Sequence, residues 1–158
     1  SFIDNTGSIG DYKQKTTLNV YFSDNTGKAL VAIPVDITYN ATISLEQLAI
    51  EQLISGPYTI EGVSKNNVLP TIPKGTVLNK VTVKENTCYA DFSKEFLNKE
   101  DNITDYVAIY SVVNTLVELP SVNKVQFSID GEQVLKYNQN INFGEAFERN
   151  LDLVRETK

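Results

Sequence analysis

The sequence of 158 residues contains no histidine, no tryptophan and no methionine, and it has a single cysteine. Histidine is the side chain whose ordinary pKa lies nearest to neutral pH. Its absence excludes Ser-His-Asp and Cys-His catalysis as well as zinc sites with histidine ligands. One cysteine cannot form an intramolecular disulfide, so the cysteine count indicates neither an oxidising nor a reducing compartment.

Positive charge is also scarce, because 14 basic residues stand against 20 acidic ones and the net charge is −6. Only Arg149 and Arg155 are arginines, the residue best suited to bidentate phosphate contacts. Since nucleic-acid affinity depends mainly on cations that neutralise phosphates, we expect no nucleic-acid partner. No stretch approaches the ~18 apolar residues of a membrane-spanning helix, so we expect membrane attachment only through an anchor upstream of Ser1.

The overall composition is that of a globular protein, with 41% hydrophobic and 22% charged residues. A chain of this length fits one domain and buries roughly 70% of its unfolded surface, enough to need no disulfide or metal. Residues 1–15 are rich in turn formers, which predicts a flexible N-terminal lead. We predict a single domain over residues 16–150 and a C-terminal tail over residues 151–158.

Alternating apolar residues predict strands at residues 17–22 and 30–39, joined by a turn around Asp24 and Gly27. Pro34 lacks a backbone donor, so the second of these strands is expected at a sheet edge or interrupted. Ser44, followed three residues later by Gln47, is a capping-box pattern that predicts a helix, and Gly56 ends that helix.

A second helix is predicted to start at Thr104 and Asp105 and to end before Pro120. Its apolar face at helical spacing comprises Tyr106, Ile109, Tyr110, Val113, Leu116 and Val117. Two hairpins complete the pattern. The first joins residues 77–83 and 87–92, and the second joins residues 125–129 and 134–137 through the turn formers Asp130 and Gly131.

In the first hairpin, one face holds Val77, Val81 and Val83 on the outgoing arm, and Cys88, Ala90 and Phe92 on the returning arm. Residues 143–158 show only weak helical spacing. The element order β-β-α-β-β-α-β-β predicts an α+β fold, with a mixed, mostly antiparallel sheet covered on one face by two helices. Because helices separate the hairpins, some neighbouring strands are expected to run parallel.

Carboxylates are the first candidates for catalysis, since they can transfer protons without histidine. They are Asp91, Glu95, Glu100 and Asp101. A glycosidase needs two carboxyls about 5–10 Å apart, one of them with a raised pKa, and nothing in the sequence marks such a pair. We interpret these residues as surface and helix-cap groups. The segments at Asp24–Gly27 and Asp130–Glu132 lack the ligand series of a helix-loop-helix calcium site, and turn formation explains both.

Cys88 is interpreted as a small buried hydrophobic residue, because no cationic neighbour in its segment would lower the pKa of its thiol. No nucleotide-binding or hydrolase motif occurs. The tyrosines expected at the surface are Tyr12, Tyr39, Tyr58 and Tyr137. The sequence thus predicts no catalytic, metal or cofactor-binding residue, and it favours a binding module over an enzyme.

Several segments in a fixed order resemble the GerMN domain of bacterial sporulation and spore germination proteins. They are LNVYF at 18–22, LISGP at 53–57, IPKGT at 72–76, ADFSKEF at 90–96, VNTL at 113–116 with Pro120, and VQFSIDG at 125–131. Within these segments Phe92, Phe96 and Phe127 are expected to fill the core, and Asn114 to satisfy buried backbone groups. The resemblance carries a fold signature and no catalytic residue.

The resemblance implies an extracytoplasmic module of a bacterium, on a lipoprotein or membrane-tethered chain. It also implies a protein partner in a cell-envelope or sporulation complex, engaged by a sheet edge or a helix face. Two alternatives stay open. One is a module that binds peptidoglycan glycan or peptide through exposed tyrosines, and the other is a wall hydrolase that uses carboxylates such as Asp91 and Glu95.

Overall fold

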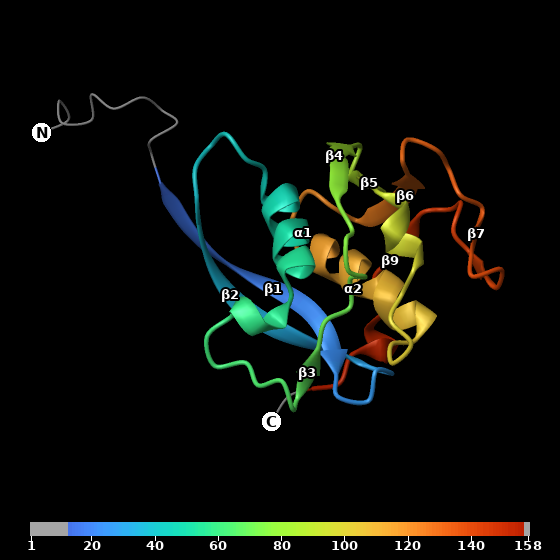
Figure 1. The fold of residues 1–158 in the computed structure, drawn as a ribbon. Coiled ribbons are helices and arrows are strands. Elements are labelled where there is room, and N and C mark those ends of the chain that lie inside the picture. The colour runs from blue at the N-terminus through green and yellow to red at the C-terminus, as the bar shows by residue number, and fades with distance from the viewer. Residues whose placement is uncertain (1–12, 157–158) are drawn as a thin grey trace, which may run out of the picture.

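The first sheet consists of three antiparallel strands in the order β2-β1-β3 (Figure 1). The computed structural model describes residues 13–156. Within them, β1 (Gln14–Asp24) pairs along its length with β2 (Leu30–Tyr39), and its end pairs with the short β3 (Val68–Leu69). Strand β1 starts inside the predicted lead, and residues 1–12, including Tyr12, lie outside the described residues.

Strand β2 is an edge strand, as its proline predicted. The Leu30 carbonyl accepts a hydrogen bond from the Arg155 N–H on the side of β2 away from β1, at 2.7 Å. Backbone groups alternate in direction along a strand, so Pro34, four residues later, also faces away from β1. Its missing N–H therefore removes no hydrogen bond from the β1–β2 ladder.

The second sheet has the order β4-β5-β6-β9 and mixes strand directions. Strand β4 (Leu78–Lys84) runs antiparallel to β5 (Thr87–Phe92), and β6 (Lys124–Ile129) runs antiparallel to β9 (Phe147–Glu148). Between them, β5 and β6 are parallel, as expected for strands separated by a helix. A two-stranded ribbon of β7 (Lys136–Tyr137) and β8 (Ile141–Asn142) completes the strands.

Both helices begin at the caps that the sequence predicted. Helix α1 (Leu45–Ser55) starts at Ser44, whose side chain accepts from the Gln47 N–H at 3.1 Å, and it ends at Gly56 with φ +88°. Helix α2 (Asp105–Val117) starts at Thr104, whose Oγ1 accepts from the Val107 N–H at 3.2 Å. These side chains satisfy backbone donors that the first helical turn leaves free.

Helix α2 lies between the two sheets and touches β1, β6, β9 and α1 (Figure 1). It is therefore buried on more sides than the predicted apolar face: Ala108, Val112 and Asn114 are buried together with Ile109. Tyr106 was wrongly assigned to that face, because it is 51% exposed at the first turn. The α+β class with mostly antiparallel strands is confirmed, although the strands form separate sheets around α2 instead of one sheet beneath two helices.

Aromatic rings fill the core beside the second sheet, and the predicted core positions of Phe92, Phe96 and Phe127 are confirmed. The ring centroids of Phe92 and Phe96 are 4.6 Å apart, and those of Phe127 and Phe143 are 4.9 Å apart. Such offset stacking adds to the burial of apolar area. Tyr137, predicted to be exposed, is fully buried in this cluster, and its ring lies 5.5 Å from that of Phe143.

Asn114 has the structural role that its position predicted. Its Nδ2 donates to the Asn150 carbonyl and its Oδ1 accepts from the Asn150 N–H, both at 3.0 Å. The side chain is fully buried, and the two bonds attach the segment after β9 to the last turn of α2. They satisfy backbone groups that strand pairing leaves without a partner.

Two strand predictions were wrong. The turn at Asp130 and Gly131 forms, but only Ile129 and Glu132 pair across it, and the second edge of β6 pairs instead with β9, at Lys124 and Val125. Val77 is 55% exposed instead of facing the core. The prediction assumed that every second residue back from Val81 faces the core. An irregularity in β4 between Leu78 and Lys80 shifts its pairing with β5 by one residue, so Val77 does not share the face of Val81.

The predicted helical spacing near the C-terminus does not describe the structure either. Phe147 lies in strand β9, and a single 3-10 turn follows at Leu151–Leu153. After it, Val154 bridges Leu30 in parallel, and Arg155 bonds to the Leu30 backbone. These residues extend the outer edge of the first sheet.

Candidate functional site

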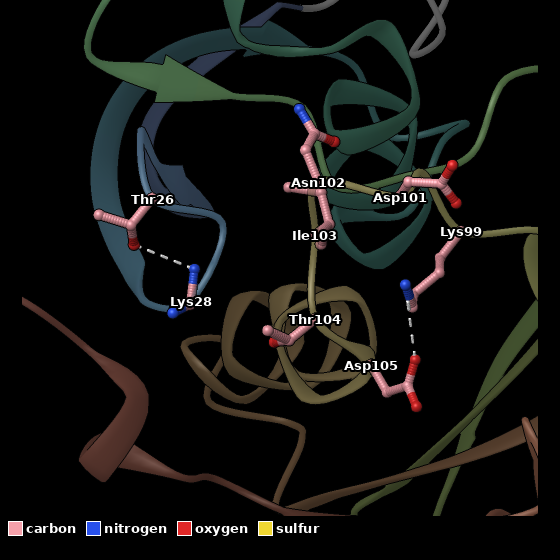
Figure 2. Close-up of a pocket in the computed structure, with 8 residues that line it drawn as sticks. All are labelled: Thr26, Lys28, Lys99, Asp101, Asn102, Ile103, Thr104 and Asp105. Atoms are coloured by element: carbon pink, nitrogen blue, oxygen red, sulfur yellow. Dashed lines mark hydrogen bonds and ion pairs between the residues drawn. The ribbon is translucent and has the colours of Figure 1, made fainter.

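A shallow depression of about 540 Å³ lies at the N-terminal end of α2 (Figure 2). Its lining comes from the β1–β2 turn and from the loop that leads into α2. The lining residues are Thr26, Lys28, Lys99, Asp101, Asn102, Ile103, Thr104 and Asp105. It contains Asp101, one of the carboxylates that the sequence suggested.

The turn that forms one wall of this depression is fixed by Asp24. Its carboxylate Oδ1 accepts from the Thr26 N–H at 3.0 Å and from the Thr26 hydroxyl at 2.6 Å. Its Oδ2 lies 3.0 Å from the Arg155 guanidinium, and the side chain is almost completely buried. These contacts agree with the interpretation of Asp24 as a turn residue.

The turn is held against the other wall at Gly27. This residue has φ +76°, and a Cβ added to it would lie 1.7 Å from the Asn102 carbonyl oxygen. The Gly27 carbonyl accepts from the Thr104 N–H at 3.0 Å. The depression thus lies where the turn of the first sheet packs against the start of α2.

Two of the charged groups in the depression, Lys99 and Asp105, contact each other. Lys99 Nζ lies 3.8 Å from Asp105 Oδ1, as Figure 2 shows. The same oxygen accepts from Asn138 Nδ2 at 2.9 Å, and the Thr104 hydroxyl caps the helix. Asp101 lies exposed in the loop. The arrangement positions a helix start and a turn, and it contains no pair of carboxylates hydrogen-bonded to each other within residues 13–156.

The other suggested carboxylates lie in different segments. Asp91 is on β5, and its carboxylate oxygens accept from the Gly131 N–H at 2.8 and 3.1 Å. Glu95 is in the 3-10 turn Lys94–Leu97, where a hydrogen bond from the Ser93 side chain lowers the pKa of Glu95. Glu100 precedes α2. A general acid needs a raised pKa, so the shift at Glu95 is opposite to that role.

Cys88 is fully buried on the inner face of β5, as its alternation with Ala90 and Phe92 predicted. Burial raises the pKa of the Cys88 thiol to about 12, and the charge of Glu46 adds to this rise. The thiolate is the nucleophilic form of cysteine. At neutral pH the Cys88 side chain is therefore a protonated, inaccessible thiol.

The opposite face of the second sheet is exposed to solvent. Its side chains alternate with the buried ones of β4, β5 and β6, and we refer to this surface as the outer face. Its members are Thr82, Lys84, Tyr89, Asp91, Lys124 and Gln126. Tyr89 stands in the middle strand, 44% exposed, with Thr82 and Gln126 as its cross-strand neighbours.

Tyr89 was not among the tyrosines that the sequence singled out as exposed. Of those, Tyr58 is 39% exposed as predicted, Tyr39 is half-buried and Tyr137 is buried. The signal for Tyr89 was present, because it alternates with Cys88 and Ala90 on a half-buried strand. The alternation shows that Tyr89 lies on the face opposite Cys88. It does not show which face of the sheet the helices cover, so it could not predict that the outer face stays open.

Comparisons of the chain with known proteins agree with one another. The model of the Germane family, described as sporulation and spore germination, matches residues 19–135. The spore germination protein GerM of Bacillus subtilis (strain 168) is 33% identical over 93 residues, which are 58% of this chain and 24% of that protein. The similarity therefore extends over about a quarter of the length of this curated relative.

Solved structures show the same fold at lower identity. The tandem GerMN domains of the sporulation protein GerM from Bacillus subtilis match with a TM-score of 0.68 and 22% identity, over 89% of this chain and 48% of that one. The first GerMN domain of the same protein matches with a TM-score of 0.58 and 22% identity, over 85% of this chain and 96% of that one. A putative lipoprotein from Clostridium perfringens matches with a TM-score of 0.56 and 20% identity, over 91% of this chain and 93% of that one.

Proposed function

The chain belongs to the Germane family of sporulation and spore germination domains, and from this membership we propose that it is a non-catalytic, extracytoplasmic module that binds a protein partner of the cell envelope. The likeness to a putative lipoprotein supports the extracytoplasmic location. Within residues 13–156 no helix has the length and apolar character needed to cross a membrane.

The observation that carries this proposal is the open outer face with Tyr89 at its middle. Protein interfaces commonly have an aromatic anchor that becomes buried, surrounded by a polar rim. Tyr89 has the exposed ring for such an anchor, and Thr82, Lys84 and Lys124 supply polar groups around it. Because the ring stands on the central part of a paired sheet, little conformational entropy is lost when it binds.

The same face supports a protein partner better than a wall glycan. The Gln126 amide beside Tyr89 donates its Nε2–H to the Gly144 carbonyl at 2.9 Å, and the Asp91 carboxylate accepts from the Gly131 N–H. Both polar groups are therefore committed within the domain. Fewer free groups remain to hydrogen-bond the hydroxyls of a sugar, whereas burial of an apolar ring does not require them.

The test is capture of envelope proteins from sporulating cells, followed by reconstitution with the purified partner. We expect Tyr89→Ala to weaken binding by roughly tenfold or more, the effect of removing an interface anchor. Tyr106→Ala is the matched control, because Tyr106 is 51% exposed but lies on α2, away from the outer face. It should bind as the unchanged protein does.

Equal binding by the Tyr89→Ala protein would contradict the proposal. Sedimentation with purified peptidoglycan sacculi that depends on Tyr89 would instead favour the glycan-binding alternative. Release of muropeptides that is lost in Asp91→Asn or Glu95→Gln proteins, still folded, would show a hydrolase.

A further inference from the structure

A second hollow, of about 400 Å³, lies where helix α1 ends. Three segments line it: the end of α1 with residues 54–58, the loop of residues 70–75 that leads to β4, and the residues Glu100 and Asn102 before α2. We refer to it as the α1-end groove. Its volume falls at the lower end of the range of small ligand pockets, so it would hold a few residues of a peptide.

The walls of the α1-end groove are apolar and stiff. Pro57, Pro70 and Pro73 each have a ring that fixes one backbone dihedral. Tyr58 is 39% exposed, and its hydroxyl donates to the Val68 carbonyl at 2.7 Å, which fixes the direction of the ring. A surface that is already ordered loses little entropy on binding an extended chain.

The C-terminal end of α1 places partial negative charge at one end of the groove. The last turn of α1 has no basic residue, and the Gly56 N–H bonds to the carbonyls of Gln52 and Leu53. Among the described residues no hydrogen bond reaches the carbonyls of Ile54 and Ser55, and proline at position 57 has no N–H to offer. A helix C-terminus with free carbonyls carries a partial negative charge.

Three charged side chains lie in or beside the groove. Glu100 lines the groove, and within residues 13–156 its carboxylate forms no ion pair. Lys74 also lines the groove and is exposed. Lys65 places its Nζ 5.5 Å from the centroid of the Tyr58 ring. That contact is a cation–π interaction within the domain.

We propose that the α1-end groove binds an extended segment of a protein partner that carries a lysine side chain. The ammonium group lies at the free carbonyls of α1 and near Glu100, while the apolar neighbours of the lysine pack on Ile54, Pro70 and Tyr58, which are the more accessible apolar residues of the lining. Lysine suits this site because its long apolar stem can lie along a hydrophobic wall while its charge reaches a polar end. The net charge of −6 favours the approach of a cationic segment.

Fluorescence anisotropy with two labelled pentapeptides tests the proposal. One is Ala-Pro-Lys-Pro-Ala, and the other has norleucine in place of lysine, which keeps the stem and removes the charge. At low salt we expect the lysine peptide to bind roughly fivefold tighter, the size of one favourable contact with a helix end. Amide resonances of Gly56 and Gly75 should shift during titration.

Charge variants give effects of opposite sign. Glu100→Gln should weaken binding of the lysine peptide by roughly threefold, and Lys74→Gln should strengthen it by a similar factor. Glu132→Gln, a change at an exposed carboxylate outside the groove, is the matched control and should leave the affinity unchanged. Tyr89→Ala should also leave it unchanged, so the groove and the outer face are tested separately.

The proposal is overturned if the norleucine peptide binds as tightly as the lysine peptide, or if neither binds. It is also overturned if Glu100→Gln has no effect or if Lys74→Gln weakens binding. Tighter binding of a muropeptide with a free diamino acid than of the lysine peptide would assign the groove to the cell wall instead of a protein.

Discussion

At the scale of single residues, Gly27 controls how the first sheet meets α2. Its backbone has φ +76°, and the Asn102 carbonyl oxygen occupies the place where a side chain would begin. Since the obstacle is backbone, no side-chain rotation can relieve it. The hydrogen bond from the Thr104 N–H to the Gly27 carbonyl holds the two segments at this distance.

Gly27→Ala should therefore lower the free energy of unfolding by roughly 3 kcal/mol or more, the sum of a left-handed backbone cost and a forced displacement. Gly62→Ala is the matched control. Gly62 has φ +86° but nothing within 4 Å of its Cβ position, so it should lose only about 1 kcal/mol. Urea unfolding measures both, and equal losses would show that the contact with Asn102 is not rigid.

Cys88 predicts a dependence of stability on alkaline pH. Burial raises the pKa of its thiol from 9.0 to about 12 in the folded protein. A raised folded pKa means that the unfolded chain loses the proton first. Its contribution to stability is complete below pH 9 and declines as pH rises toward 12, by about 1.4 kcal/mol per pH unit.

The measurement is urea unfolding of the unchanged protein and of Cys88→Ala between pH 8 and 12. Both proteins contain the same tyrosines, so their ionisation affects the two curves alike. The stability advantage of the unchanged protein should shrink steadily above pH 9. A difference that stays constant over this range would mean that the thiol is accessible to solvent in the fold.

At the scale of elements, the free edge of β2 is protected by its proline. Edge strands present unpaired N–H groups to other chains, and proline removes one of them. Pro34 faces away from β1, in phase with Leu30, whose carbonyl bonds outward to the Arg155 N–H. It thereby interrupts the outer edge without weakening the β1–β2 ladder.

Pro34→Val should change the free energy of unfolding by less than about 1 kcal/mol, while self-association increases, as measured by sedimentation velocity over a range of concentrations. Thr38→Val is the matched control, since it introduces the same side chain on the same strand where the N–H is already present. A Pro34→Val protein that remains monomeric to the same concentration as the control would argue against edge protection.

At the scale of the whole molecule, the residues after β9 close the first sheet. Val154 pairs with Leu30, and the Arg155 guanidinium reaches the buried Asp24 carboxylate at 3.0 Å. Leu153 and Val154 also pack on a second hydrophobic cluster, which contains Tyr21 and Val107. The C-terminal segment thus joins the first sheet to α2.

Removal of residues 151–158 should reduce the free energy of unfolding by roughly 2–3 kcal/mol, because Leu153 and Val154 are partly buried against this cluster. Leu151→Ala, at a side chain that is 58% exposed, is the control and should change it by less than about 0.5 kcal/mol. Unchanged stability of the shortened protein would mean that residues 151–158 are a separable tail, as the sequence predicted.

The sequence by itself determined the local structure of this protein. Ser44, Gly56 and Thr104 set the ends of the helices, and the alternation of Cys88 with Ala90 set the inner face of β5. These features depend on interactions within a few residues, so a single sequence contains all the information they need. The order of such segments also indicated the family.

The tertiary structure alone decided which elements meet. It placed α2 between two sheets, gave the second edge of β6 to β9 instead of residues 134–137, and buried Tyr137 among phenylalanines. It also left Tyr89 on an open face and brought the end of α1 beside Glu100. A strand edge or an apolar face accepts many partners of similar energy, and only the packing of the complete chain selects one of them.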